Sequence, residues 1–200
     1  MKLELPGGSF RAYLFDCDGT IVDSMPLHFL AWKRLLAEWN FELERELFYS
    51  WGGIPDADII AGLKKNHGLS IPFEDAAKQK ERFYCELLPQ LKAIPEVLEH
   101  IEARFGEIPY AVVSGGERSS VTASLTTLGL LDKFDTIVCA GDYEKGKPDP
   151  EPFLVAAARL GVRPEDCLVF EDAELGIQSA VAAGMAFVRV PTSCERGHAI

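Results

Sequence analysis

Two aspartates separated by one residue follow a short apolar segment near the start of the chain. Ala12–Phe15 is apolar throughout, which is typical of a strand buried on both faces of a parallel sheet, and Asp16-Cys17-Asp18-Gly19-Thr20 comes next. Alternating side-chain direction places Asp16 and Asp18 on one side and Cys17 on the other, toward the core. Carboxylates this close repel unless a cation lies between them, and Mg²⁺ suits all-oxygen ligation. An ordinary Asp-Gly turn is the alternative.

Three further polar groups follow predicted strands. Ser114-Gly115-Gly116 precedes a predicted helix, where a hydroxyl and bare amides can hold an anion, although a serine helix cap is the alternative. Lys147 is kept extended by the following proline, and Glu171-Asp172 ends another apolar segment; a surface charge and a helix cap are their alternatives. The carboxyl ends of parallel strands meet at one sheet edge, where ligands bind. We therefore expect all these groups to lie together.

The elements that position these groups alternate between strand and helix. Short apolar segments predict strands at 12–15, 110–113, 136–140, 167–170 and 186–190. Helical patterns separate the later strands, at 96–105, 118–128, 150–160 and 173–183, and Gly129, Gly161 and Gly184 follow helix ends as left-handed caps require. This alternation predicts an α/β fold, a Rossmann-like parallel sheet with helices on both faces.

No strand is predicted between residues 22 and 90. Trp32, Leu35, Leu36 and Trp39 form an apolar helical stripe, and residues 56–66 and 73–88 have helical patterns. Asp23 or Ser24 can cap the first of these helices. The sequence therefore predicts an all-helical insertion over 22–90, directly after the strand that bears the acidic pair, and a core built from 1–21 and 91–200.

Composition excludes several classes of partner. The 200 residues include 31 acidic and 20 basic ones, for a formal charge of −11, which disfavours binding to nucleic acid or an anionic membrane. The first eight residues lack the apolar segment of a signal peptide, and no segment is long enough to span a membrane. Five scattered cysteines without a C-x-x-C pair, three of them in apolar strand-like segments, are expected to be reduced core thiols. We expect a cytoplasmic protein that is a monomer or weak dimer.

Two other catalytic motifs fail on inspection. Residues 141–147 spell G-x-x-x-x-G-K after a predicted strand, but Pro148 stands where a nucleotide-binding loop needs a Ser or Thr to bind Mg²⁺. No cysteine has an arginine six residues later, as a thiol phosphatase would require. A P-loop NTPase and a thiol phosphatase are therefore excluded.

In their order along the chain, Asp16-x-Asp18-Gly19-Thr20, Ser114, Lys147-Pro148-x-Pro150 and Glu171-Asp172 resemble the motifs of the haloacid dehalogenase-like hydrolase superfamily. The resemblance is to its phosphatases and phosphomutases of small sugar phosphates. It implies that Asp16 attacks phosphorus to form an aspartyl-phosphate and that Asp18 serves as general acid and base. It also implies that Ser114 and Lys147 hold phosphoryl oxygens. The implied Mg²⁺ ligands are the carboxylates of Asp16 and Asp172, with Glu171 as a further ligand, and the backbone carbonyl of Asp18.

The helical insertion corresponds in this resemblance to a cap that closes over the site and contacts the organic part of the substrate. His28, ten residues after Asp18, resembles the cap histidine of the sugar phosphomutases, although an exposed helix histidine is the alternative. Together with Gly115, Gly116 and Lys80, His28 is expected to bind substrate.

Two positions depart from the mutase pattern. Asp56 and Glu117 occur where the mutases carry an arginine and a lysine, which disfavours a bisphosphate intermediate, although Lys80 and Arg82 could replace those cations. A dehalogenase is disfavoured because Asp18 supplies acid–base chemistry that carbon–halogen displacement does not need. We therefore expect a Mg²⁺-dependent phosphatase of a small phosphate ester, a phosphoric monoester hydrolase. A phosphosugar mutase or a non-catalytic metabolite-binding protein on the same fold are the alternatives.

Overall fold

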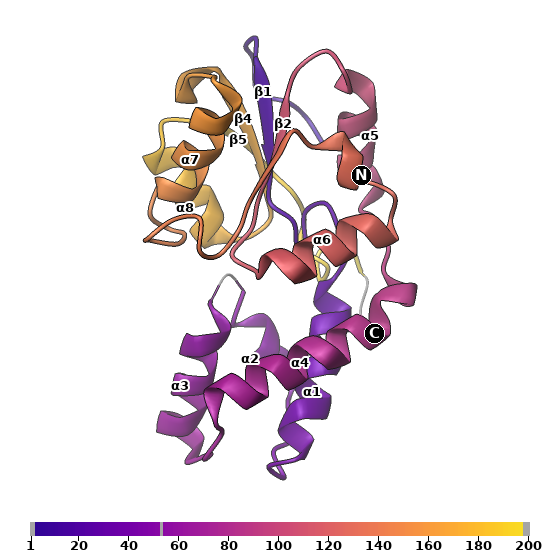
Figure 1. Cartoon of the computed structure of the whole chain (residues 1–200), viewed down its shortest axis with the longest axis vertical. Coiled ribbons are helices and arrows are strands. Elements are labelled where there is room, and N and C mark those ends of the chain that lie inside the picture. Colours follow the sequence, from indigo (N-terminus) through magenta and orange to yellow (C-terminus); the bar gives the residue numbers. More distant parts are fainter. Residues whose placement is uncertain (1–2, 53, 198–200) are drawn as a thin grey trace.

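The computed structural model describes residues 3–52 and 54–197, and it contains a five-stranded, all-parallel sheet (Figure 1). The expected core extends over 1–2 and 198–200, which lie outside the described residues. In sheet order the strands are β3 (Thr136–Val138), β2 (Tyr110–Val113), β1 (Ala12–Phe15), β4 (Cys167–Glu171) and β5 (Ala186–Arg189). The predicted α/β fold is confirmed.

Helices cover both faces of this sheet because alternate strand residues point to opposite sides. Phe15 and its same-face neighbours pack with residues of α5 (Pro95–Arg104) and α6 (Arg118–Thr127). Leu14 and its same-face neighbours pack with residues of α7 (Glu151–Leu160) and α8 (Glu174–Ala182). Figure 1 shows α7 and α8 on the side of the sheet opposite α5.

Of the helices between β1 and β2, the first four form a separate group below the sheet in Figure 1. They are α1 (Met25–Ala37), α2 (Arg45–Tyr49), α3 (Asp56–His67) and α4 (Phe73–Leu87), followed by a 3₁₀ turn at Leu88–Gln90. The two connections to the sheet run side by side, since Val22 pairs antiparallel with Ala93 and the Ile94 amide donates to the Ile21 carbonyl at 2.9 Å. These connections flank the predicted insertion 22–90.

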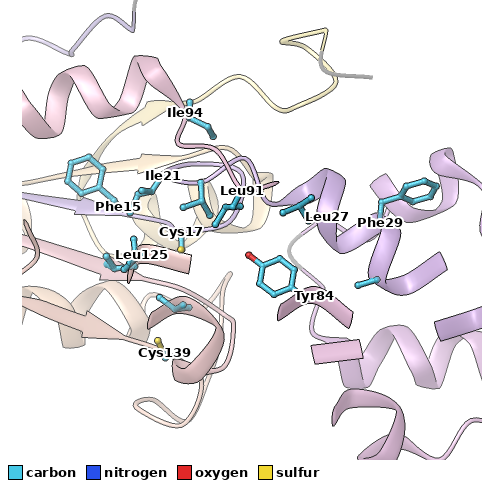
Figure 2. Packing of buried hydrophobic residues seen from close by; sticks show 14 of the residues in the cluster. Phe15, Cys17, Ile21, Leu27, Phe29, Tyr84, Leu91, Ile94, Leu125 and Cys139 are labelled. Atoms are coloured by element: carbon cyan, nitrogen blue, oxygen red, sulfur yellow. The ribbon is translucent and has the colours of Figure 1, made fainter. Parts of the chain in front are cut away.

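The apolar core continues from the sheet into this helical group. Phe15, Cys17 and Leu125 from the sheet side belong to one cluster with Leu27 and Tyr84 from the helical side. Figure 2 shows Tyr84 between these two parts of the cluster. The helical group is therefore held against the sheet by buried apolar contacts close to the carboxyl end of β1.

Most predicted bounds agree with the structure to within one residue, and two elements differ more. β3 ends at Val138 and not at residue 140, because the Cys139 amide donates to Asp142 Oδ2 at 2.8 Å and so leaves the ladder. α2 was not predicted, since five residues are too few to show helical periodicity. The left-handed caps expected at Gly129, Gly161 and Gly184 are confirmed by φ values of 66°, 67° and 73°. Among the described residues, no helix combines the length and the apolar character needed to cross a membrane.

Candidate active site

The strand order places a binding site between β1 and β4. From central β1 the chain proceeds to β2 and β3 on one side and then to β4 and β5 on the other. Ligands in open α/β sheets bind beyond the carboxyl ends of the strands where the order reverses. Asp16 directly follows β1, its amide donates to the Phe170 carbonyl at 3.0 Å, and Glu171 is the last residue of β4.

Three carboxylates and one ammonium group meet at this point. Asp16, Glu171 and Asp172 each offer one oxygen atom, and these atoms lie within 4.8 Å of one another. Lys147 Nζ donates to Asp16 Oδ1 at 2.7 Å, to Glu171 Oε1 at 3.0 Å and to the Val113 carbonyl at 3.0 Å. The structure therefore brings together four of the residues expected from the sequence, from three separate parts of the chain.

The electrostatics of this cluster fit a divalent cation. Burial and the charge of Glu171 raise the pKa of Asp16 well above its usual range, and Lys147 opposes this only in part. Burial and Glu171 likewise raise the pKa of Asp172 from its usual 3.8 to about 7. Lys147 stays charged, because its two carboxylate partners raise its pKa despite its burial. The cluster holds three carboxylates but only one ammonium group, and carboxylate oxygens are the donors that hard cations prefer.

Two glycines make room for these carboxylates. Gly19 has a φ of +88°, and a Cβ atom there would lie 2.3 Å from Asp172 Oδ2. A Cβ atom at Gly176, in the first half of α8, would lie 1.5 Å from Glu171 Oε1. The Glu171 side chain also accepts the Asp172 amide at 2.8 Å. Gly176 was not singled out from the sequence, where an unexplained glycine within a helical pattern was the available signal.

Asp18 lies apart from the three-carboxylate cluster. Its carboxylate accepts a hydrogen bond from Ser24 Oγ at 2.6 Å, and His28 Nε2 lies 3.3 Å from the same oxygen. Burial disfavours the charged form of Asp18, but hydrogen bonds from His28 and Ser24 prevail and lower its pKa to about 2. Within the described part of the chain, the carboxylates close enough together to share a metal ion are those of Asp16, Glu171 and Asp172, and the Asp18 side chain is not among them. Ligation through the Asp18 backbone carbonyl stays a prediction.

The side chains of Asp23 and Ser24, expected to cap the first helix of the insertion, make other hydrogen bonds. Ser24 occupies the N-cap position of α1 without a capping bond from its side chain, because its hydroxyl donates to Asp18. Asp23 accepts from Ser193 Oγ at 2.7 Å and pairs with Arg196 at 3.1 Å. Ser24 is thus at the expected N-cap position, but the expected capping hydrogen bond is absent. Its side chain and that of Asp23 instead tie the start of α1 to Asp18 and to the C-terminal segment.

Ser114 and the glycines after it border Asp18. Ser114 is 2% exposed and its Oγ accepts the Gly116 amide at 3.0 Å. A Cβ atom at Gly116 would lie 3.8 Å from Asp18 Oδ2, so this backbone passes close to the carboxylate. Gly115 is exposed, and its surroundings leave open space where a side chain would be. The serine hydroxyl expected to hold an anion thus lies one strand away from Asp16.

Lys80 is a buried, paired lysine of the helical group. Although a lysine, it is only 8% exposed; its ammonium lies 3.0 Å from Asp56 Oδ2 and 5.9 Å from the centre of the Trp32 ring. Its charge is one of the influences that lower the pKa of Asp18. Asp56, the acidic residue that departs from the mutase pattern, is therefore the ion-pair partner of Lys80, whereas Arg82 is exposed.

Thr20 and Cys17 are buried beside the aspartates, one as a hydrogen-bond donor and the other as a core residue. Thr20 Oγ1 donates to Asp172 Oδ1 at 3.2 Å, a contact that was not predicted because the two residues are 152 positions apart. Cys17 is fully buried in the core cluster, as expected from its place between the aspartates, whereas two of the five cysteines are exposed and lie outside the expected core. Burial and the charge of Asp18 raise the pKa of the Cys17 thiol, which keeps it protonated.

Without metal, the protein should be less stable at pH 8 than at pH 5. Asp172 titrates near 3.8 when unfolded and near 7 when folded, so between these values the unfolded state binds fewer protons and the free energy of unfolding falls as pH rises. Asp16 acts in the same direction, and Asp18, with its lowered pKa, is ionised in both states. We expect the melting temperature to drop by more than about 4 °C, at ~2–4 °C per kcal/mol.

Thermal unfolding in a chelating buffer at pH 5 and pH 8 measures this drop. Saturating Mg²⁺ should raise the melting temperature more at pH 8, where the carboxylates are charged, than at pH 5. The Asp172→Asn variant should flatten the pH dependence in the absence of metal. A metal-free protein that melts higher at pH 8 than at pH 5 would contradict the expectation.

The chain matches a known protein family over most of its length. Residues 13–190 match the family model described as haloacid dehalogenase-like hydrolase. Fructose-1-phosphate phosphatase YqaB of Escherichia coli (strain K12) is 35% identical over 182 residues, covering 90% of this chain and 96% of the relative. Beta-phosphoglucomutase of Bacillus subtilis (strain 168) is 34% identical over 188 residues, covering 90% of this chain and 83% of the relative.

A solved structure agrees with these sequence matches. The crystal structure of beta-phosphoglucomutase from Clostridium difficile is similar with a TM-score of 0.81 and 26% identity, covering 95% of this chain and 88% of that chain. The family model spans the strands and the acidic, serine and lysine positions assembled above. Sequence, fold and site therefore agree that the chain belongs to the haloacid dehalogenase-like hydrolases.

Proposed function

We propose that this protein is a Mg²⁺-dependent phosphatase that hydrolyses a small sugar phosphate through an aspartyl-phosphate intermediate. The observation that carries the proposal is the separation of two kinds of carboxylate at one sheet edge. Asp16 lies in an anionic cluster and is held by Lys147, whereas Asp18 is held apart by Ser24 and His28. Environments that push the pKa values of paired carboxylates in opposite directions indicate different roles in acid–base chemistry.

Asp16 is the proposed nucleophile. Lys147 orients its carboxylate at 2.7 Å, and the buried position removes competing water. One Asp16 oxygen attacks phosphorus, the bond from phosphorus to the substrate alkoxide breaks, and an aspartyl-phosphate forms. Water then attacks this phosphorus, which releases inorganic phosphate and regenerates the Asp16 carboxylate.

Asp18 is the proposed acid–base residue. Its pKa of about 2, lowered by His28 and Ser24, keeps it a carboxylate at neutral pH before substrate binds. A dianionic phosphoryl group beside it raises its pKa, because two negative charges disfavour each other. The protonated form can then give its proton to the leaving alkoxide, and the carboxylate later takes a proton from the attacking water.

The remaining polar groups would neutralise and position the phosphoryl group. Asp16, Glu171, Asp172 and the backbone carbonyl of Asp18 would hold Mg²⁺. When bound, this ion supplies positive charge that offsets repulsion between the nucleophile and its anionic ester. Ser114, with the amides of Gly115 and Gly116, would hold phosphoryl oxygens together with Lys147.

The helical group, residues 22–90, is the proposed cap over this site. From this group, His28 Nε2 lies 3.3 Å from the Asp18 carboxylate, and the charge of Lys80 lowers the pKa of Asp18. The pair of Lys80 with Asp56 offers both a donor and an acceptor, which suits the hydroxyl groups of a sugar. We include a cytoplasmic location in the proposal, based on the five unpaired cysteines.

Phosphate release from a substrate panel tests the proposal. The panel contains sugar phosphates, polyol phosphates, phosphoglycolate and nucleoside monophosphates, assayed with Mg²⁺ and with a chelator. We expect the best substrate to be a small phosphosugar, with kcat/KM at least about tenfold above that of nucleoside monophosphates. Activity should disappear with the chelator and return with excess Mg²⁺. The proposal fails if no ester yields phosphate while substrate-like ligands still bind.

A mutase is the second candidate, because beta-phosphoglucomutase is among the similar proteins. The ion pair of Lys80 with Asp56 argues against a mutase, because the Asp56 carboxylate neutralises the Lys80 charge and leaves less positive charge in the cap to bind a second phosphate. The products from a hexose 1-phosphate separate the two activities. A phosphatase yields the free sugar and inorganic phosphate, whereas a mutase yields the hexose 6-phosphate.

A further inference from the structure

Tyr84 stacks on the histidine that contacts Asp18. Its ring is fully buried in α4 and lies parallel to the His28 ring, with ring centres 4.1 Å apart and an angle of 7° between the planes. His28 comes from α1, and its Nε2 lies 3.3 Å from Asp18 Oδ1. The face of this imidazole is therefore covered by a phenol ring from a second helix.

His28 depends on this stacking for its orientation. A functional histidine usually has its second ring nitrogen fixed by another hydrogen bond, which sets the orientation of the ring. Here Nδ1 is buried, and the described residues offer it no hydrogen-bond partner. The contact with Asp18 fixes the position of Nε2 but does not fix the plane of the imidazole ring. Parallel packing against Tyr84 restricts the orientation of this plane.

Tyr84 is itself held by a hydrogen bond to α6, on the sheet side. Its hydroxyl lies 2.8 Å from Ser124 Oγ, and Ser124 donates its own hydroxyl proton to the Ser120 carbonyl in α6 at 2.9 Å. The Tyr84 hydroxyl must therefore be the donor to Ser124. Burial and the charge of Asp18 raise the pKa of Tyr84, so this phenol keeps its proton. A second link, from Ser120 to Glu81, joins the same two helices.

We propose that Tyr84 is a positioning residue for the acid–base step. It connects α6, on the sheet, to His28 in the helical group, and through His28 to Asp18. The inference rests on the proposed function insofar as Asp18 is taken as the acid–base residue. Figure 2 shows Tyr84 at the junction, between the cluster residues of the sheet side and those of the helical side.

A double-mutant cycle distinguishes positioning from packing. Tyr84→Leu removes the stacked ring and should lower kcat/KM about 10- to 100-fold, because small misplacement of a catalytic contact has effects of this size. In the His28→Ala background the same substitution should change kcat/KM by less than about twofold, because the ring that Tyr84 orients is already gone. Additive losses in the double variant would overturn the proposal.

Two variants control for the loss of an aromatic side chain. Phe83→Leu removes the neighbouring buried ring of α4, which packs on Arg34 of α1. It should lower the melting temperature about as much as Tyr84→Leu but leave kcat/KM unchanged. Tyr84→Phe keeps the stacking and should retain kcat/KM within about threefold. A loss in Tyr84→Phe equal to that in Tyr84→Leu would overturn the role of stacking.

Histidine ring NMR separates failure of this inference from failure of the proposed function. The stacked Tyr84 ring should shift the His28 carbon-bound proton signals upfield, and His28→Ala would assign these signals among the four histidines. Tyr84→Leu should move these signals downfield, while Phe83→Leu should not. Unmoved His28 signals overturn the inference even in an active phosphatase. Moved signals in a protein that hydrolyses no phosphate ester would support the stacking and overturn only the proposed function.

Discussion

Asp16→Asn is expected to abolish turnover while leaving the protein folded. The amide cannot attack phosphorus, and loss of a nucleophile lowers kcat by at least about 10⁴-fold. Asparagine has the same shape, and it removes a charge that burial and Glu171 disfavour. The metal-free variant should therefore melt at the same temperature as the wild type or higher.

Phosphate release under single-turnover and steady-state conditions measures this loss, with thermal unfolding alongside. Asp135→Asn is the matched control, because Asp135 accepts the Tyr110 amide at 2.8 Å at the other end of the sheet and an amide oxygen can replace it. That control should keep its kcat within about twofold. Turnover retained in Asp16→Asn would exclude Asp16 as the nucleophile.

Lys147→Met is expected to reduce both stability and activity. Methionine preserves most of the apolar contacts, including those beside the Phe153 ring, but removes the ammonium between Asp16 and Glu171. Removing one partner of a buried ion pair costs about 3–5 kcal/mol, because the remaining charge is left uncompensated. Loss of the proposed contact between Lys147 and the phosphoryl group should lower kcat by about 10²–10³-fold as well.

Urea unfolding with and without Mg²⁺ tests the stability part of this prediction. Mg²⁺ should recover part of the lost free energy of unfolding, because it can neutralise the carboxylates that Lys147 no longer faces. Lys145→Met provides the control, since Lys145 is an exposed lysine two positions away. An unfolding free energy of Lys147→Met equal to that of Lys145→Met would contradict the buried role of Lys147.

Most of the fold could be predicted from the sequence because it depends on local patterns. Strands buried on both faces appear as short apolar segments, and the glycines after α6, α7 and α8 mark helix ends. Parallel strands bring their carboxyl ends to one edge, so Asp16, Lys147 and Glu171 could be expected there before any contact was known. Five-residue α2 escaped prediction because its length carries too little periodicity.

Contacts within the site required the tertiary structure, because they join side chains whose separation in the chain has no characteristic period. Ser24 could be recognised as a candidate cap, but its rotation toward Asp18 depends on how α1 meets β1. The pairing of Lys80 with Asp56 depends on the packing of α3 and α4.

Contacts between distant parts of the candidate active site likewise required the tertiary structure. Gly176 adjoins Glu171 because α8 folds back against the end of β4, and Tyr84 reaches Ser124 across 40 positions. Local sequence determined which chemical groups stand at the strand ends. The three-dimensional packing of helices determined how those groups are oriented, paired and charged, because burial and neighbouring charges arise only when distant elements come together.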